Sequence, residues 1–193
     1  MRDSLLRKAT ESARVAQELI ARDAAAFETC VRKMAYCFGR GGKLLTMGNG
    51  GSACDALHLA VEFQHPILEK RRALPALSLA ADLAVVTAIG NDADFTLIFS
   101  EQIRLIGKAG DIALGISTSG QSANVARGLK QARDMGMLTI ALSGRDGGRL
   151  VDIAEHCFVV PSFSIHRIQE AHTLLLHLLW DQVQVALGEE DVL

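Results

Sequence analysis

Short apolar runs alternate with longer stretches of helical spacing along most of this 193-residue chain, and this alternation limits the folds that the chain can adopt. Two parallel strands need a crossover connection, which is usually a helix, so the alternation predicts a parallel sheet covered by helices on both faces. Strands that are buried on both faces are continuous apolar runs, as these are. We expect strands at residues 43–48, 74–79, 111–117, 138–144 and 156–161.

Helical spacing of apolar residues also marks both ends of the chain. Residues 4–22 and 24–38 predict two antiparallel N-terminal helices, which the glycine-rich residues 39–42 end. The last helix, expected over 164–187, is apolar nearly all round at its middle, and we expect it to be buried in a subunit interface. Between these ends we expect helices at 53–65, 82–106, 122–135 and 147–154.

Composition excludes several classes of protein. The net charge is −2 and no basic stripe is present, so we expect no nucleic-acid partner. No apolar run approaches the roughly 18 residues of a membrane span, so we expect no membrane partner. The four cysteines form no CxxC pair, which is typical of reduced thiols in a cytoplasmic protein. Without repeats, low-complexity segments or linkers, residues 1–193 are expected to form a single domain.

Two polar loops follow predicted strands, at the edge where open α/β sheets bind ligands. "GNGGSA" follows the first strand, and "STSGQSAN" (117–124) follows the third. Glycines let the backbone approach an anion, and the next helix offers free N–H groups and the positive end of its dipole. The alternative is that the hydroxyls cap these helices, but four hydroxyls within six residues favour phosphate. The expected phosphate-binding residues are Asn49, Gly50, Gly51, Ser52, Ser117, Thr118, Ser119 and Ser122.

A dinucleotide site is a competing interpretation of the first loop. Gly48, Gly50 and Ala53 fit the pattern G-x-G-x-x-A. A dinucleotide-binding unit also needs an acid about 20 residues later, at the end of its second strand, and Asp82 comes too late. This interpretation also leaves the second polar loop unexplained, so phosphate binding is favoured.

Two predicted helices carry residues that suit a metal ion or acid–base chemistry. His58 and Glu62 are four residues apart and share a helix face. On the last helix, Gln169 and His177 are about 80° apart around the axis. The four side chains form one mixed nitrogen and oxygen site if the helices meet, suited to zinc or another divalent ion. The alternatives are a core histidine at His58 and a solvated helix face at Glu62.

Four segments together resemble the phosphoheptose isomerases, which belong to the SIS (sugar isomerase) domain group: "GNGGSACDALH", "GISTSGQSANV", "LSGRDGG" and "RIQEAHTLLLH". The resemblance extends over nearly the whole chain. It implies a three-layer α/β/α fold with a five-stranded parallel sheet, two N-terminal helices and a long C-terminal helix. It also implies a homotetramer with active sites between subunits, in which residues 1–40 serve oligomerisation and residues 41–193 form the sheet and its covering helices.

The family interconverts sedoheptulose 7-phosphate and D-glycero-D-manno-heptose 7-phosphate, an early step toward the heptose of lipopolysaccharide or other surface glycans. The resemblance implies that Glu62 is the catalytic base and His177 the acid of a proton transfer through an enediol(ate). It also implies one zinc ion per subunit on His58, Glu62, Gln169 and His177. Asp92 and Gln169 match positions near the sugar.

Two departures keep other functions open. Pro66, in "FQHPILEKRR", and His166 stand where the family usually has an arginine and an aspartate near the sugar, so a different phosphosugar is a second hypothesis. A non-catalytic scaffold that binds the replication initiator is a third, but that branch lacks the acid and the last histidine that this chain keeps as Glu62 and His177. A phosphosugar-sensing regulator is a fourth, and it would need a DNA-binding domain beyond these 193 residues.

Overall fold

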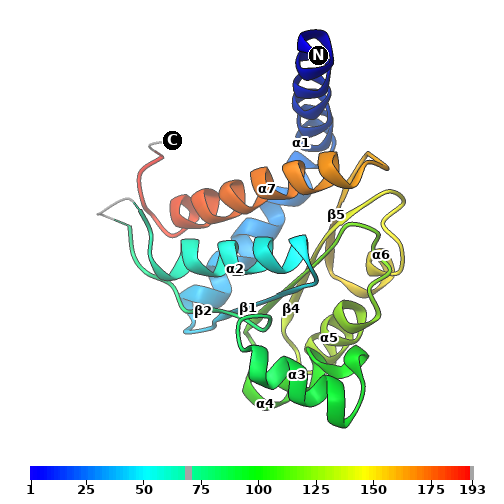
Figure 1. Cartoon of the computed structure of the whole chain (residues 1–193). Helices are drawn as coiled ribbons and strands as arrows, with labels where there is room; N and C mark the ends of the chain where they lie inside the picture. The colour runs from blue at the N-terminus through cyan, green and yellow to red at the C-terminus, as the bar shows by residue number, and fades with distance from the viewer. Residues whose placement is uncertain (68–70, 192–193) are drawn as a thin grey trace.

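A five-stranded parallel sheet forms the centre of the molecule, as expected from the sequence (Figure 1). The computed structural model describes residues 1–67 and 71–191. The strand order is β2-β1-β3-β4-β5, and every neighbouring pair is parallel. The strands are β1 (Leu44–Gly48), β2 (Ala76–Ser78), β3 (Ile112–Ser117), β4 (Leu138–Gly144) and β5 (His156–Val160).

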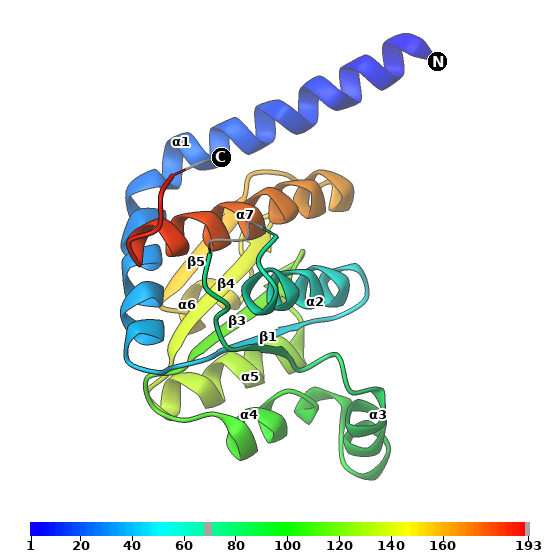
Figure 2. The same cartoon turned by 90° about the vertical axis from the view of Figure 1, so that its left-hand side faces the viewer.

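Helices cover both faces of this sheet, which gives the predicted three layers (Figure 2). One core packs α1 (Arg2–Gly39), α2 (Gly51–Gln64) and α7 (Ile165–Ala186) on the first face, around side chains such as Leu44 and Ile112. The second core packs α4 (Ser100–Ile106), α5 (Ala123–Asp134) and α6 (Leu150–Ile153) on the opposite face. All residues of β1, β3 and β4 are buried, which explains their continuous apolar runs.

The prediction of two antiparallel N-terminal helices was wrong. One helix, α1, runs without a break over Arg2–Gly39. Residues 21–26, where the two helices were expected to separate, contain four alanines and neither glycine nor proline, so helix propensity favours continuation. Figure 2 shows that α1 changes direction along its length. Its second half packs on the sheet through residues such as Phe27 and Met34, while its N-terminal part projects away.

The single helix expected over 82–106 is divided into three pieces. These are α3 (Leu83–Asp92), a short 3-10 turn η1 (Phe95–Leu97) and α4. The Asp82 and Asp94 side chains accept hydrogen bonds from the backbone N–H groups of Val85 and Thr96. Each aspartate therefore caps a new segment, as short acidic side chains commonly do.

The five strands and the remaining helices lie where the sequence predicts them, within a few residues at each end. Within residues 1–67 and 71–191, no helix combines the length and the apolar character that crossing a bilayer requires.

Candidate functional site

The two polar loops meet at the carboxyl edge of the sheet because β1 and β3 are neighbouring strands. Their side chains join them directly. The Asn49 amide donates to Asn124 Oδ1, and the Asn124 amide donates to Asn49 Oδ1, each over 2.8 Å. Asn124 is buried, so this reciprocal pair holds the loops in one relative position. Asn124 did not figure among the expected site residues, although it closes the segment "STSGQSAN".

Two hydroxyl groups of the second loop, those of Ser117 and Ser122, face each other, and Ser122 does not cap the following helix. Ser117 Oγ lies 2.9 Å from Ser122 Oγ. Ser122 is the residue at the start of α5, yet its side chain makes no capping hydrogen bond with any described residue. Ser119 Oγ accepts a hydrogen bond from the Gln121 N–H, and Thr118 and Ser119 are partly exposed. This arrangement leaves hydroxyl groups in the loop for a bound anion.

Glycine is required where the second loop packs against the loop after β4. A Cβ atom on Gly120 would lie 1.9 Å from the Gly147 carbonyl oxygen, and the φ angle of Gly120 is +65°. In the first loop, Gly50 has a φ angle of +55° at the start of α2. These positions fix the loop shapes that the sequence predicted from their glycines.

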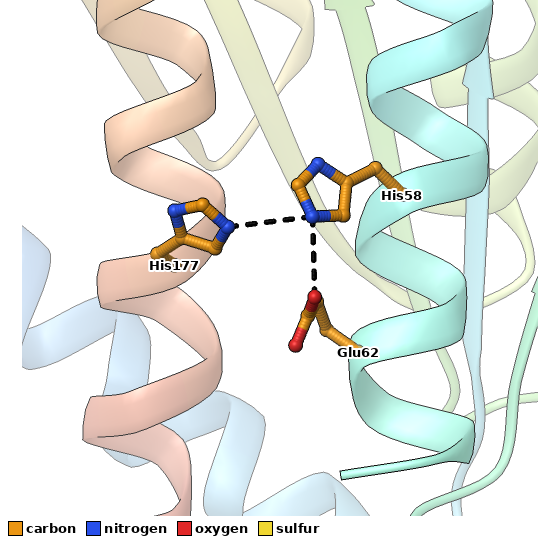
Figure 3. Close-up of side chains that lie close together, drawn as sticks. All are labelled: His58, Glu62 and His177. Carbon is orange, nitrogen blue, oxygen red and sulfur yellow. Dashed lines mark hydrogen bonds and ion pairs between the residues drawn. The ribbon is translucent and has the colours of Figure 1, made fainter. Parts of the chain in front are cut away.

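His58, Glu62 and His177 converge between α2 and α7 (Figure 3). His58 Nε2 lies 3.1 Å from Glu62 Oε1 and 3.3 Å from His177 Nε2, although His58 and His177 are 119 positions apart in the chain. One ligand atom from each of the three residues lies within 4.8 Å of the others. His58 and Glu62 are partly buried and His177 is exposed. The two helices therefore meet as the metal hypothesis requires.

The three converging side chains fit a divalent metal ion. Two imidazole nitrogens and one carboxylate oxygen are the donor set of many catalytic zinc sites, which keep a further position open. His58 Nε2 faces both His177 Nε2 and Glu62 Oε1, so the three ligand atoms border one small region (Figure 3).

Gln169 and Asp92, which the sequence also predicts as site residues, do not join the three converging side chains. The Gln169 amide packs against Gly51 at the first turn of α2, where an added Cβ would be 2.3 Å from Gln169 Nε2. The side chain of Gln169 thus lies beside the phosphate loop, about 12 Å along α7 from His177 by helical rise. Asp92 ends α3, is exposed, and accepts a hydrogen bond from Asn91. The roles of both residues stay predictions.

Burial shifts the pKa values of two ionisable side chains near the site, His172 and Asp55. Burial lowers the pKa of His172 to about 4, and the hydrogen bond with the Ser143 carbonyl opposes this. His172 is fully buried and fixes α7 to the end of β4. Burial also raises the pKa of Asp55, one turn before His58, and the charge of His58 opposes this rise.

A cleft of about 740 Å³ opens beside Glu62. Val61 and Glu62 from α2 form one wall, and the segment His65–Ile67 with Arg71 and Ala73 forms the rest. Pro66, one of the two departures noted in the sequence, therefore lines the same cleft as Glu62. Arg71 lines this cleft but was not predicted to belong to the site.

This fold and its paired phosphate-type loops define a SIS domain, and the SIS domain family model matches residues 9–144. A phosphoheptose isomerase of Pelobacter propionicus is 45% identical over 178 residues, which cover 92% of this chain and 94% of that protein. The chain belongs to the phosphoheptose isomerase family, and it is an isomerase.

Solved structures agree with this assignment. The structure of a phosphoheptose isomerase from Neisseria gonorrhoeae superposes with a TM-score of 0.88 at 38% identity, covering 95% of this chain and 98% of that one. A phosphoheptose isomerase from Francisella tularensis gives a TM-score of 0.90 at 34% identity, covering 95% and 97%.

Proposed function

We propose that this enzyme interconverts sedoheptulose 7-phosphate and D-glycero-D-manno-heptose 7-phosphate. The observation that carries the proposal is the convergence of Glu62 and His177 between α2 and α7, in a chain that also joins two polar loops at the carboxyl edge of its sheet. Phosphate bound by the loops would anchor one end of the sugar, and the acid–base pair of the proposed tetramer would act on the other end. The phosphoheptose isomerase of Pelobacter propionicus, similar over 92% of this chain, supports the same substrate.

In the proposed mechanism, Glu62 removes a proton from carbon 2 of the aldose or carbon 1 of the ketose. His177 passes a proton to or from the oxygen atoms, and the electron pair moves through an enediol(ate). The same proton returns to the neighbouring carbon, so atoms and charge balance. Glu62 Oε1 pairs with His58, which leaves its second oxygen to reach the substrate carbon.

The proposed cofactor is one zinc ion per subunit, with His58, Glu62 and His177 as ligands. Gln169, the fourth ligand that the family resemblance implies, would have to turn away from Gly51 to reach the same ion. Bound zinc would stabilise negative charge that develops on the sugar oxygens. A carboxylate that holds a metal tightly is a poorer base, so we propose a weakly held ion. The donor set described above supports this assignment.

We also propose a homotetramer in which a second subunit completes the site. Exposed apolar residues flank the three converging side chains: Leu57 and Val61 on α2, and Leu174 on α7. The projecting part of α1 exposes Leu5 and Leu6 as well. Monomeric proteins rarely leave such contiguous apolar surface open, so a second copy is its proposed occupant.

The enzyme is proposed to work in the cytoplasm, in the synthesis of the heptose of lipopolysaccharide or of another surface glycan. Its four cysteines are free thiols in the described part of the chain, which agrees with a reducing compartment.

Nuclear magnetic resonance of the purified protein with sedoheptulose 7-phosphate tests the proposal. We expect conversion to the aldose, lost in Glu62→Gln while inorganic phosphate still binds. Turnover near the wild-type rate in Glu62→Gln would refute the assigned base. Because Pro66 borders the cleft, pentose and hexose phosphates belong in the same assay, and faster conversion of one of them would favour a different phosphosugar.

A further inference from the structure

We infer that Arg71 and Asp181 are positioning residues that set the spacing between the helices carrying Glu62 and His177. The inference rests on the proposed function, because Glu62 and His177 must act on one substrate. Arg71 lies beyond the end of α2 and lines the cleft beside Glu62. Asp181 lies one helical turn after His177 on α7. Among the described residues, neither side chain forms a hydrogen bond or ion pair with Glu62 or His177, so each would act through the chain segment that it fixes.

The contacts of Arg71 all lead to α7 and the segment that follows it. Arg71 Nη1 and Asp181 Oδ1 form an ion pair at 2.7 Å that is not aligned as a hydrogen bond. Arg71 Nη2 donates to the Glu190 carbonyl oxygen over 3.1 Å. The guanidinium carbon lies 4.7 Å from the ring centroid of Trp180. A planar guanidinium makes these three contacts at once, which a lysine ammonium does not.

Burial shows that this contact is more than a surface ion pair. The Arg71 and Asp181 side chains are 3% and 9% exposed. Removing charges from water is costly, and apolar residues of similar size often give equal or greater stability than a buried pair. Stability alone therefore explains poorly why a charged pair is buried here. The pair is better explained by its effect on geometry, since it fixes the segment after α2 in position relative to α7.

The position of the pair along the chain explains what it would control. Glu62 lies in the last full turn of α2, which ends at Gln64. The backbone N–H of Leu74 donates to the Phe63 carbonyl, and Arg71 ties the same returning segment to α7. The end of α2 is thus held to α7 from the far side of the cleft. Loosening this attachment would let the Glu62 carboxylate move relative to His177.

The experiment compares four variants in steady-state turnover of sedoheptulose 7-phosphate: Arg71→Met, Arg71→Lys, Asp181→Asn and the double variant Arg71→Met/Asp181→Leu. We expect kcat to fall about 10- to 100-fold in Arg71→Met while KM and the dissociation constant of inorganic phosphate change less than about threefold, because displacement of a catalytic group by about 1 Å has that effect. Arg71→Lys should recover only part of kcat.

The double variant separates positioning from stability. It removes both buried charges together, so we expect its unfolding midpoint to return toward that of the wild type while kcat stays low. Wild-type kcat in a stably folded double variant would overturn the inference. So would a KM increase at constant kcat in Arg71→Met, since that pattern belongs to a residue that binds substrate directly.

Arg72→Met is the matched control. Arg72 is the next residue and contacts the Leu187 carbonyl and the Glu189 carboxylate, but its side chain is about half exposed and lies outside the residues lining the cleft. We expect its kcat to match the wild type. An equal fall of kcat in Arg72→Met and Arg71→Met would overturn the inference.

Two readouts do not depend on turnover. Trp180 is the only tryptophan of the chain, so its fluorescence reports the loss of the stacked guanidinium. Amide hydrogen exchange over residues 60–66 should become about 10-fold faster in Arg71→Met and stay unchanged in Arg72→Met. Unchanged hydrogen exchange in Arg71→Met would overturn the inference, whether or not the wild type converts this substrate. If the wild type is inactive but exchange is faster in Arg71→Met, only the proposed substrate is refuted.

Discussion

Asn49 and Asn124 exchange two side-chain hydrogen bonds of 2.8 Å and thereby join the loops that follow β1 and β3. Neither loop can shift without breaking both bonds, and Asn124 has little access to replacement water. The proposed anion site therefore depends on the pair of loops together, more than on either loop alone.

We expect Asn124→Ala to weaken the binding of inorganic phosphate about 10-fold, because the Asn49 amide loses its partners and the loops lose their fixed relation. Calorimetric titration with phosphate measures this loss. Asn49→Ala and the double variant should lose no more than Asn124→Ala, since all three break the same link. Additive losses in the double variant would show that the asparagines act independently. Asn91→Ala, which removes an exposed amide on α3, is the control.

Zinc binding to the purified protein should depend on His58 and His177. Their Nε2 atoms converge with Glu62 Oε1. Loss of a residue that only supports a metal ligand commonly weakens metal binding 10- to 100-fold. We therefore expect zinc affinity to fall about 100-fold or more in His58→Gln or His177→Gln. Titration with zinc measures it without any need for turnover. His156→Gln, at the start of β5, should bind as the wild type does. Equal affinity in all variants would place the ion elsewhere.

The free energy of unfolding should fall as the pH is lowered below about 6.5, in part because of His172. Its pKa is about 4 in the folded chain and about 6.5 when unfolded, so the unfolded state binds more protons between these values. The stabilisation is complete above the unfolded pKa and is lost as the pH falls toward the folded pKa. Between pH 7 and pH 5 the expected loss from this group is about 2 kcal/mol.

Urea unfolding at both pH values tests this dependence on His172. In His172→Gln the pH dependence should be smaller than in the wild type by that amount, although the overall stability will also change. An identical pH dependence in the two proteins would assign the effect to other groups.

Gly51→Ala should impair the site with little effect on the fold. An added Cβ would lie 2.3 Å from Gln169 Nε2, so the flexible Gln169 side chain must move away, while alanine favours the helix. If Gln169 binds substrate or metal as proposed, turnover should fall about 10-fold or more while the unfolding midpoint stays within a few degrees. Gly39→Ala, at the end of α1 with no atom within 4 Å of the new Cβ, is the matched control. Full activity in Gly51→Ala would remove Gln169 from the site.

The positions of the five strands could be predicted because strands that are buried on both faces are continuous apolar runs in the sequence. It failed for α1 because apolar spacing on either side of residues 21–26 cannot show whether a helix bends or ends. The loops were predictable from local patterns of glycine and hydroxyl residues. The sequence could predict that His58 and His177 form one site only if α2 and α7 pack together, and the packing itself could not be predicted from local patterns.

Asn124 and Arg71 were missed for the same reason, since each gains its role from a partner distant in the chain. One signal for the second pair was present in the sequence. Asp181 is a lone acid in the apolar stretch "LLWDQV", and a buried acid needs a cationic partner.

The order of the site residues along the chain has a consequence for protein synthesis. Both phosphate loops lie before residue 125, whereas His177 belongs to α7, the last helix that the structure describes. A ribosome makes the anion cradle well before it makes the proposed proton donor. On the roles proposed here, both anion-binding loops are synthesised before the residue that would donate the proton, and chemistry begins only when the final helix docks beside α2.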